Sequence, residues 1–418
     1  MKKKPVVLLP IPSVPYPLVS GGHLRDWQIL NLLNKLGIQP HLIYFGAGQG
    51  HELDPGSPVF GLAKTVQFGG HRVEQPISTV PQVAQRKLAY LLSSNPRSFP
   101  SSYQYDAINA GSVIAKAARQ LNADVVILRN MWCHYADELA ATGSRVIINC
   151  PDFNTKLARQ MIKAVRNPLK KIGPICNYAA VRRQERRFFP RSDEIWIPTD
   201  AEASEISQFA RHVQRLVLPN LVDVSSMPDL SEKPVNSTIH SLLFVGNFSY
   251  LPNANGARRL LEQVIPEIRR RKPDVELLLV GAGLPEDLKV AAAALGRVRV
   301  TGFVESVHEY YATSTIVVLP VREGAGMLFK ALEALALGKP AVGYRESFRG
   351  IDPTGPVPFI SVDSDDEMAH AIVQLLDSAP ARRDLGARAR AYAESSLSWE
   401  FGATVLSGSR TLFGETYA

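Results

Sequence analysis

The residues best placed to do chemistry stand in one stretch, which begins at Arg322 and ends at Glu333. An apolar, β-branched run at 315–320 comes just before it and predicts a strand buried on both faces. The Gly-Ala-Gly turn at 324–326 lets the backbone approach a ligand closely. A helix expected at 327–337 would place its positive dipole end at this turn. Together these features predict a site for an anionic ligand such as a phosphate.

The expected helix at 327–337 is apolar on most sides, and only Lys330 and Glu333 interrupt the pattern. Such a helix is typically buried, and buried charges need partners. One cation and one carboxylate on a single stripe suit a ligand that carries both phosphate and hydroxyl groups. The alternative is an ordinary i, i+3 ion pair at the surface of a helix.

Length and composition indicate a soluble protein of two domains. The 418 residues exceed the roughly 250–300 at which one core stops growing. The three cysteines, Cys133, Cys150 and Cys176, fit no disulfide or zinc spacing and favour a reducing compartment. The short apolar run after the first lysines is broken by prolines, which indicates a strand rather than a signal peptide. We therefore expect a cytoplasmic protein without a metal site.

Much of the formal net charge of +8 falls in one basic segment, residues 166–191, where eight cations face only Glu185. Such a segment can contact a phosphorylated substrate or an anionic membrane, which would put the protein at the inner membrane face. A solvated helix face is the alternative interpretation. Nucleic acid is an unfavoured partner, because the sequence carries no nucleic-acid-binding motif and no stacking aromatic residues in a basic groove.

Strands alternate with helices in two series, which predicts parallel sheets covered by helices on both faces. Residues 47–103 are expected to be irregular apart from a helix near 81–92, and 219–236 has the composition of a linker. The last clear strand is expected at 340–344. The other expected strands are 5–10, 40–46, 124–128, 145–150, 194–198, 215–218, 241–248, 276–281, 297–301 and 315–320.

A series of motifs in the second half resembles the C-terminal half of glycosyltransferase family 4, in order over about 100 residues. The N-terminal half fits more loosely, through Tyr16-Pro17 with Gly21-Gly22 and through Pro219-Asn220. The loop at 322–326 is similar to that of an exopolysaccharide-type branch with the pattern Arg-x-Gly-x-Gly. The motifs are Phe244–Phe248, Tyr250–Asn255, Leu278–Gly281, Val300–Val304, Pro320–Gly326 and Lys330–Pro340.

This resemblance implies the α/β GT-B fold, with two Rossmann-like doubly wound domains facing across a cleft. The implied N-terminal acceptor domain covers 1–220, and a C-terminal helix at about 398–418 packs back on it. Residues 221–397 would form the donor domain. The implied activity is retaining transfer from a nucleotide-diphosphate sugar.

The resemblance also implies roles for individual residues. Glu333 would bind the ribose hydroxyls, and Arg322 and Lys330 would neutralise the diphosphate. The remaining donor contacts would come from residues at strand ends and glycine turns. These are Gly21, Gly22, Gly246, Asn247, Gly302, Phe303, Val304, Gly324, Ala325 and Gly326.

The sequence departs from the family pattern at several positions. Ala325 stands where the family has its first glutamate, and Asn247 replaces an arginine. The Pro252-Asn253 turn occupies the region of a missing lysine. We interpret these changes as relocated chemistry, with Arg322 and Lys330 taking over the phosphate contacts.

In the N-terminal half, Arg129 stands where the family often has a histidine. His134, five residues on, is a candidate catalytic residue, with a packing or surface role as the alternative. Asp152 is a candidate for contact with the acceptor, with an N-cap or loop role as the alternative.

The resulting prediction is a retaining glycosyltransferase that needs no metal and no cofactor beyond its sugar donor. The acceptor would be a glycan, a lipid-linked molecule or a small molecule. Two alternatives stay open. One is a catalytically silent GT-B partner that binds nucleotide sugar, which Ala325 favours, and the other is a nucleotide-sugar epimerase.

Overall fold

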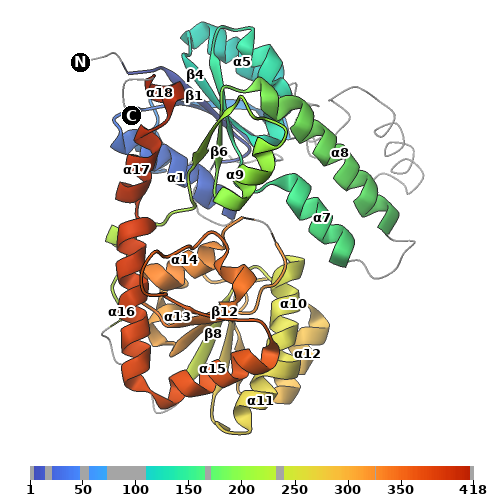
Figure 1. Cartoon of the computed structure of the whole chain (residues 1–418), viewed down its shortest axis with the longest axis vertical. Helices are drawn as coiled ribbons and strands as arrows, with labels where there is room; N and C mark the ends of the chain where they lie inside the picture. Colours follow the sequence, from blue (N-terminus) through green and yellow to red (C-terminus); the bar gives the residue numbers. More distant parts are fainter. Residues whose placement is uncertain are drawn as a thin grey trace. The chain divides into compact units, whose positions relative to one another are not determined.

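The computed structural model describes residues 4–14, 21–47, 56–72, 110–164, 171–231, 240–324 and 326–414. The chain divides into two compact units (Figure 1). The first unit is Met1–Pro219 together with Gly402–Ala418, and the second is Asn220–Phe401.

The first unit is built on a seven-stranded sheet in the order β3-β2-β1-β4-β5-β6-β7. All of its strand pairs are parallel. The order reverses between β1 and β4, as in a doubly wound fold. The strands are β1 Val7–Ile11, β2 His41–Ala47, β3 Thr65–Arg72, β4 Val125–Arg129, β5 Arg145–Asn149, β6 Glu194–Ile197 and β7 Gln214–Val217.

The second unit repeats this topology in a six-stranded sheet with the order β10-β9-β8-β11-β12-β13. All five pairs are parallel, and the order reverses between β8 and β11. The predicted α/β class with two Rossmann-like sheets is therefore confirmed. The strands are β8 Ser241–Val245, β9 Glu276–Val280, β10 Val298–Val300, β11 Ile316–Leu319, β12 Ala341–Tyr344 and β13 Ile360–Val362.

Helices connect the strands, as parallel pairing requires. In the first unit they are α1 Gly21–Lys35, α2 Val59–Leu62, α5 Ala110–Leu121, η2 Asn130–Tyr135, α6 Ala136–Ala140, α7 Asn154–Ala164, α8 Ile172–Phe188, η4 Phe189–Arg191, α9 Asp200–Ser207, the C-terminal part of α17 Trp399–Ser407, and α18 Arg410–Phe413. In the second they are η5 Val224–Ser226, α10 Leu251–Arg259, η6 Leu260–Val264, α11 Ile265–Arg269, α12 Glu286–Leu295, α13 His308–Thr313, α14 Phe329–Ala336, η7 Arg345–Phe348, α15 Asp365–Asp377 and α16 Ala379–Ser396.

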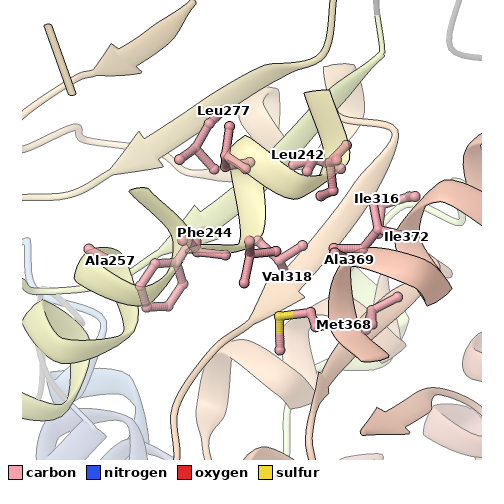
Figure 2. Packing of buried hydrophobic residues seen from close by; sticks show 14 of the residues in the cluster. Leu242, Phe244, Ala257, Leu277, Ile316, Val318, Met368, Ala369 and Ile372 are labelled. Atoms are coloured by element: carbon pink, nitrogen blue, oxygen red, sulfur yellow. The ribbon is translucent and has the colours of Figure 1, made fainter. Parts of the chain in front are cut away.

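The second sheet is buried on both faces because successive side chains of a strand point to opposite sides. Phe244 and Val318 lie in one core with residues of α10, η6, α11, α12 and α15 (Figure 2). Leu243 and Val317 lie in the opposite core with α13, α14 and α16. This double burial explains why the strands read as continuous apolar runs in the sequence.

Two edge strands were not predicted. The expectation of irregular structure at 47–103 is wrong for α2 and β3, and 340–344 is not the last strand, because β13 follows it. Both β3 and β13 lie at the edge of a sheet, where exposed polar positions replace the apolar run that identifies an inner strand. The helix predicted near 81–92 lies outside the described residues.

The helical stretch from Leu251 to Arg269 consists of α10, the π-helical turn η6 and α11. Pro266, near the start of α11, has no N–H and so cannot complete an unbroken α-helical ladder. No helix in the described ranges combines the length and the apolar character that crossing a membrane requires.

Candidate active site

The candidate site lies at the carboxyl edge of the second sheet, where β8 and β11 end. In open parallel sheets, ligands bind outside the carboxyl ends of the strands at the point where strand order reverses. The loop after β8 carries Gly246 and Asn247, and the loop after β11 carries Arg322 and Gly324. The fold therefore places the sequence-predicted residues of two separate motifs at one topological switch point.

Lys330, in the first turn of α14, reaches the end of β8. Its Nζ lies 2.7 Å from Oδ1 of Asn253 and 4.5 Å from the ring centroid of Phe244. Asn253 in turn donates from Nδ2 to the carbonyl of Asn247, at 2.7 Å. Neutral groups thus hold the ammonium, and no carboxylate in the described ranges forms an ion pair with it.

Two glycines make this arrangement possible. A Cβ at Gly246 would lie 2.8 Å from Nζ of Lys330 and 2.9 Å from Nδ2 of Asn253. Gly281, after β9, has a φ of 133°, and a Cβ there would lie 2.0 Å from the carbonyl oxygen of Gly246. Side chains at these positions would displace the loop or the lysine, so the glycines keep the end of β8 open to Lys330.

Glu333 is one turn further along α14 and is held separately. The hydroxyl of Tyr311 in α13 donates to its Oε2 at 3.2 Å. The surface ion pair between Lys330 and Glu333 that the sequence left open does not form. Instead the two side chains have different neutral partners, which leaves one cation and one carboxylate side by side on the helix.

Burial moves the pKa values of Lys330 and Glu333 toward neutral pH. It lowers the pKa of Lys330 to about 7, with Glu333 acting in the opposite direction. It raises the pKa of Glu333 to about 7, against the hydrogen bond from Tyr311 and the charge of Lys330. An incoming anion would favour the charged ammonium and raise the pKa of Lys330 again.

The loop between β11 and α14 is fixed by Ser347. Its Oγ lies 2.7 Å from the carbonyl oxygen of Leu319 and 2.8 Å from that of Val321, and it accepts a bond from the Val321 N–H. Gly324 and Gly326 have φ values of 124° and 67°, which favour glycine. Ala325 lies outside the described residues.

Arg322 lies at the same edge but makes its contacts further along the sheet. Its Nη2 donates to the carbonyl of Asp363 at 2.6 Å, and its guanidinium stands 4.0 Å from the ring centroid of Tyr344. Asp363 follows β13 and Tyr344 ends β12. Arg322 and Lys330 are thus held by different strands, and the structure shows no contact between them.

Three of the implied donor contacts, Gly302, Phe303 and Val304, lie after β10. Gly302 has a φ of 72° and forms an isolated bridge with Gly281. Phe303 is 71% exposed and Val304 is half-buried. An exposed aromatic ring beside a glycine turn offers an apolar surface on which a flat ring can stack.

Gly21 and Gly22 begin α1, the helix that follows β1 in the first unit. The carbonyl of Gly22 accepts from Nη1 of Arg129 at 3.3 Å, and the same nitrogen lies 2.8 Å from Oδ1 of Asp26. Burial raises the pKa of Asp26, against the charge of Arg129. Arg129, at the position where the family often has a histidine, is therefore engaged in a buried ion pair.

His134 and Asp152 are the two other sequence-predicted residues of the first unit. The His134 ring is buried, 4.0 Å from the ring centroid of Tyr135, and its Nδ1 is 3.4 Å from Nε2 of Gln184. Asp152 lies beyond the end of β5, and its backbone carbonyl accepts from Nδ2 of Asn130 at 2.8 Å. The catalytic role of His134 and the acceptor contact of Asp152 stay predictions.

Three residues of the site were missed in the sequence. Asn253, Tyr311 and Ser347 hold the lysine, the glutamate and the glycine turn, and none stands in a pattern that identifies its partner. The departure at Pro252-Asn253 was the available signal, because a polar side chain replaces the missing family cation there. In the described ranges, no three His, Cys, Asp or Glu side chains group in a way that could hold a metal ion.

Comparison with solved structures defines the class of fold. The chain is similar to sucrose-phosphate synthase from Thermosynechococcus elongatus, with a TM-score of 0.69 at 15% identity and 96% coverage of both chains. It is also similar to Anabaena HepE in complex with UDP, with a TM-score of 0.63 at 13% identity, covering 96% of this chain and 97% of the other. The fold is that of GT-B glycosyltransferases.

Sequence comparisons give the particular relatives. Residues 239–378 match the family described as Glycosyl transferases group 1. A GDP-mannose-dependent monoacylated alpha-(1-6)-phosphatidylinositol monomannoside mannosyltransferase of Corynebacterium glutamicum is 26% identical over 217 residues, 46% of this chain and 55% of that protein. A phosphatidyl-myo-inositol mannosyltransferase of Mycolicibacterium smegmatis is 29% identical over 180 residues, 41% of this chain and 45% of that protein. The chain spans about half the length of these relatives, and the similarities support a glycosyltransferase.

Proposed function

We propose that this protein is a retaining glycosyltransferase of family 4 type. It moves a sugar from a nucleotide-diphosphate donor to a glycan, lipid-linked or small-molecule acceptor. The observation that carries the proposal is Lys330, a half-buried cation held by an amide and an aromatic ring at the switch point of the second sheet. Such a cation can bind a phosphate, because it does not already form an ion pair with a protein carboxylate.

The proposed chemistry follows from the charges in the site. When the bond between sugar and phosphate breaks, negative charge accumulates on the leaving diphosphate. Lys330, Arg322 and the backbone of the glycine turn stabilise that charge, as fixed donors do in an oxyanion hole. No divalent metal is needed in this scheme. Glu333, positioned by Tyr311, accepts hydrogen bonds from the ribose hydroxyls.

Donor identity is tested with a panel of nucleotide sugars. The panel includes GDP-mannose, the donor in the name of one relative, and UDP-glucose, which is bound in a solved structure of HepE. In a thermal-shift screen, a donor at 100 times its dissociation constant adds about 2.7 kcal/mol of stability. The member that gives the largest shift is then used in radiolabelled form.

Turnover separates the proposal from its alternatives. Transfer of the label to an acceptor, or slow hydrolysis of the donor, with retention of the anomeric configuration and in the presence of a chelator, is the expected result. Binding of the donor without either reaction would instead favour the silent partner, and release of an isomerised donor would favour the epimerase.

A further inference from the structure

A second basic site lies in the first unit, where α7, α8 and α9 meet (Figure 1). It is a pocket of about 140 Å³ lined by Arg159, Arg182 and Arg186 together with the rings of Phe153 and Phe209. The two rings are stacked, with centroids 6.4 Å apart and an angle of 18° between their planes. Its volume is similar to the roughly 150 Å³ of a cavity that holds one benzene molecule, so a phosphate group fits inside.

Aromatic contacts orient two of the three guanidinium groups. Arg186 lies 5.3 Å from the ring centroid of Phe209, and Arg159 lies 5.8 Å from that of Tyr178. Arg182 stands one turn before Arg186 on the same face of α8. A guanidinium that rests on a ring is held in place without losing its charge.

The charge in the pocket stays positive. Glu205 is the one carboxylate that lines it, and it lies 3.3 Å from Arg159. In the described part of the chain, no carboxylate forms an ion pair with Arg182 or Arg186. Because arginine presents a planar fork of donors, it binds phosphate oxygens in pairs, and two such groups on one helix face suit a phosphate well.

Glu185 fixes the helices that carry these arginines. From α8, its carboxylate accepts hydrogen bonds from the backbone N–H groups of Asn154 and Thr155, at 3.0 and 3.1 Å. This ties the first turn of α7 to α8, so Arg159 is placed relative to Arg182 before any ligand arrives. Preorganised cations lose less entropy on binding than flexible surface side chains do.

We propose that this pocket binds the phosphate group of a phosphorylated ligand, either a water-soluble sugar phosphate or a phospholipid headgroup. Arg182 and Arg186 contact the phosphate oxygens, Arg159 adds charge at the rim, and the stacked rings border the apolar part of the ligand. The site belongs to the first unit and does not depend on the nucleotide-sugar site proposed for the second.

The first arm of the test uses soluble probes. Binding of glucose 6-phosphate and of inorganic phosphate is measured by calorimetry at constant ionic strength, with no nucleotide sugar present. The variant Arg182→Gln with Arg186→Gln should bind at least tenfold more weakly than the wild type. The matched control is Arg183→Gln, a neighbouring exposed arginine of α8 outside the pocket lining, which should change affinity less than twofold. Because these arginines are exposed, the melting temperatures should stay within a few degrees.

The second arm uses vesicles of phosphatidylcholine with or without phosphatidylglycerol. Co-sedimentation that needs the anionic lipid and is lost in the double variant but kept in Arg183→Gln would support the pocket and identify a headgroup as its ligand. Affinity for the soluble probes with the same dependence would identify a sugar phosphate. The proposal is overturned if the wild type binds neither the soluble phosphates nor the anionic vesicles. It is also overturned if Arg183→Gln weakens binding as much as the double variant does. A failed transferase assay would not alter either outcome.

Discussion

The two units share one strand order, but the cations at the point where that order reverses have different kinds of partner. In the first unit, Arg129 at the end of β4 forms an ion pair with Asp26 at 2.8 Å. In the second, Lys330 beside the end of β8 is held by the neutral amide of Asn253 and the ring of Phe244. A cation already paired with a carboxylate gains little from an incoming phosphate, whereas one held by neutral groups gains more. We therefore propose that topology provides the place for a site and that charge decides which of the two places binds an anion.

Arg25 extends this contrast. Its Nη1 donates to the carbonyls of Leu218 and Pro219, at 2.9 and 2.8 Å, and its Nε to Asn149. Burial, with the nearby charge of Arg129, lowers the pKa of Arg25 to about 9. Arg25 and Arg129 therefore have protein partners within the first unit, whereas we propose that the lysine of the second unit meets a ligand.

The largest effect is expected when the ion pair of the first unit is broken. Arg129→Met leaves the buried Asp26 carboxylate without its cation, which should lower the free energy of unfolding by about 3–5 kcal/mol. Denaturant titration measures this change. Affinity for a nucleotide sugar should stay within a few fold for the folded fraction. A tenfold loss of affinity would contradict the structural role assigned to Arg129.

Lys330→Met should lower turnover by roughly 10²–10³, about 2.7–4 kcal/mol in activation free energy, a loss typical of removing one donor to a developing oxyanion. Arg322→Ala should have an effect of the same order if its guanidinium also meets the leaving group. Steady-state kinetics with the preferred donor tests both. The control is Lys289→Met, an exposed lysine of α12 that should lose less than twofold, and a Lys330→Met variant within a few fold of wild type would exclude the proposed role.

Asn253→Asp makes the second unit resemble the first, because it places a carboxylate against Lys330. We expect donor affinity to fall about tenfold, equivalent to about 1.4 kcal/mol, since the cation is then already neutralised. Asn253→Ala is the control, because it also removes the hydrogen bond that Nδ2 donates to Asn247, and it takes away the acceptor of Lys330 without adding charge. If calorimetry shows the two variants to be equally impaired, the charge argument is wrong and only the positioning of Lys330 matters.

The smallest effect concerns pH. With a pKa of about 7, the protonated fraction of Lys330 falls from about one half at pH 7 to about one tenth at pH 8. Because the donor binds best to the protonated lysine, the advantage of wild type over Lys330→Met in affinity should shrink about fivefold over this interval. Glu333, whose pKa is also about 7 and is lowered by the charge of Lys330, titrates over the same interval. If the affinity advantage of the wild type instead grew with pH, the assigned direction of the pH dependence would be wrong.

The inner strands and the two charged positions of α14 could be predicted from the sequence, because both depend on a local pattern. β11 reads as a continuous apolar run, and Lys330 with Glu333 interrupts an otherwise apolar helix. The edge strands β3 and β13 were missed, since their exposed positions break that pattern.

The partners of the charged residues could not be predicted. Asn253 is 77 positions from Lys330, and Asp26 is 103 positions from Arg129. Only the crossover connections of the two sheets bring these pairs together. The contrast between the two units therefore depends on tertiary contacts that no local motif records.

The most direct test of the central claim is calorimetric titration of the full chain with the nucleotide sugars of the panel. We predict that at least one donor binds with a dissociation constant below about 1 mM, near the weak end of typical substrate binding. We also predict that its affinity falls at least tenfold in Lys330→Met and stays within twofold in Lys289→Met. If no donor binds, or if Lys330→Met binds as tightly as wild type, the anion site at the junction of β8 and β11 is contradicted.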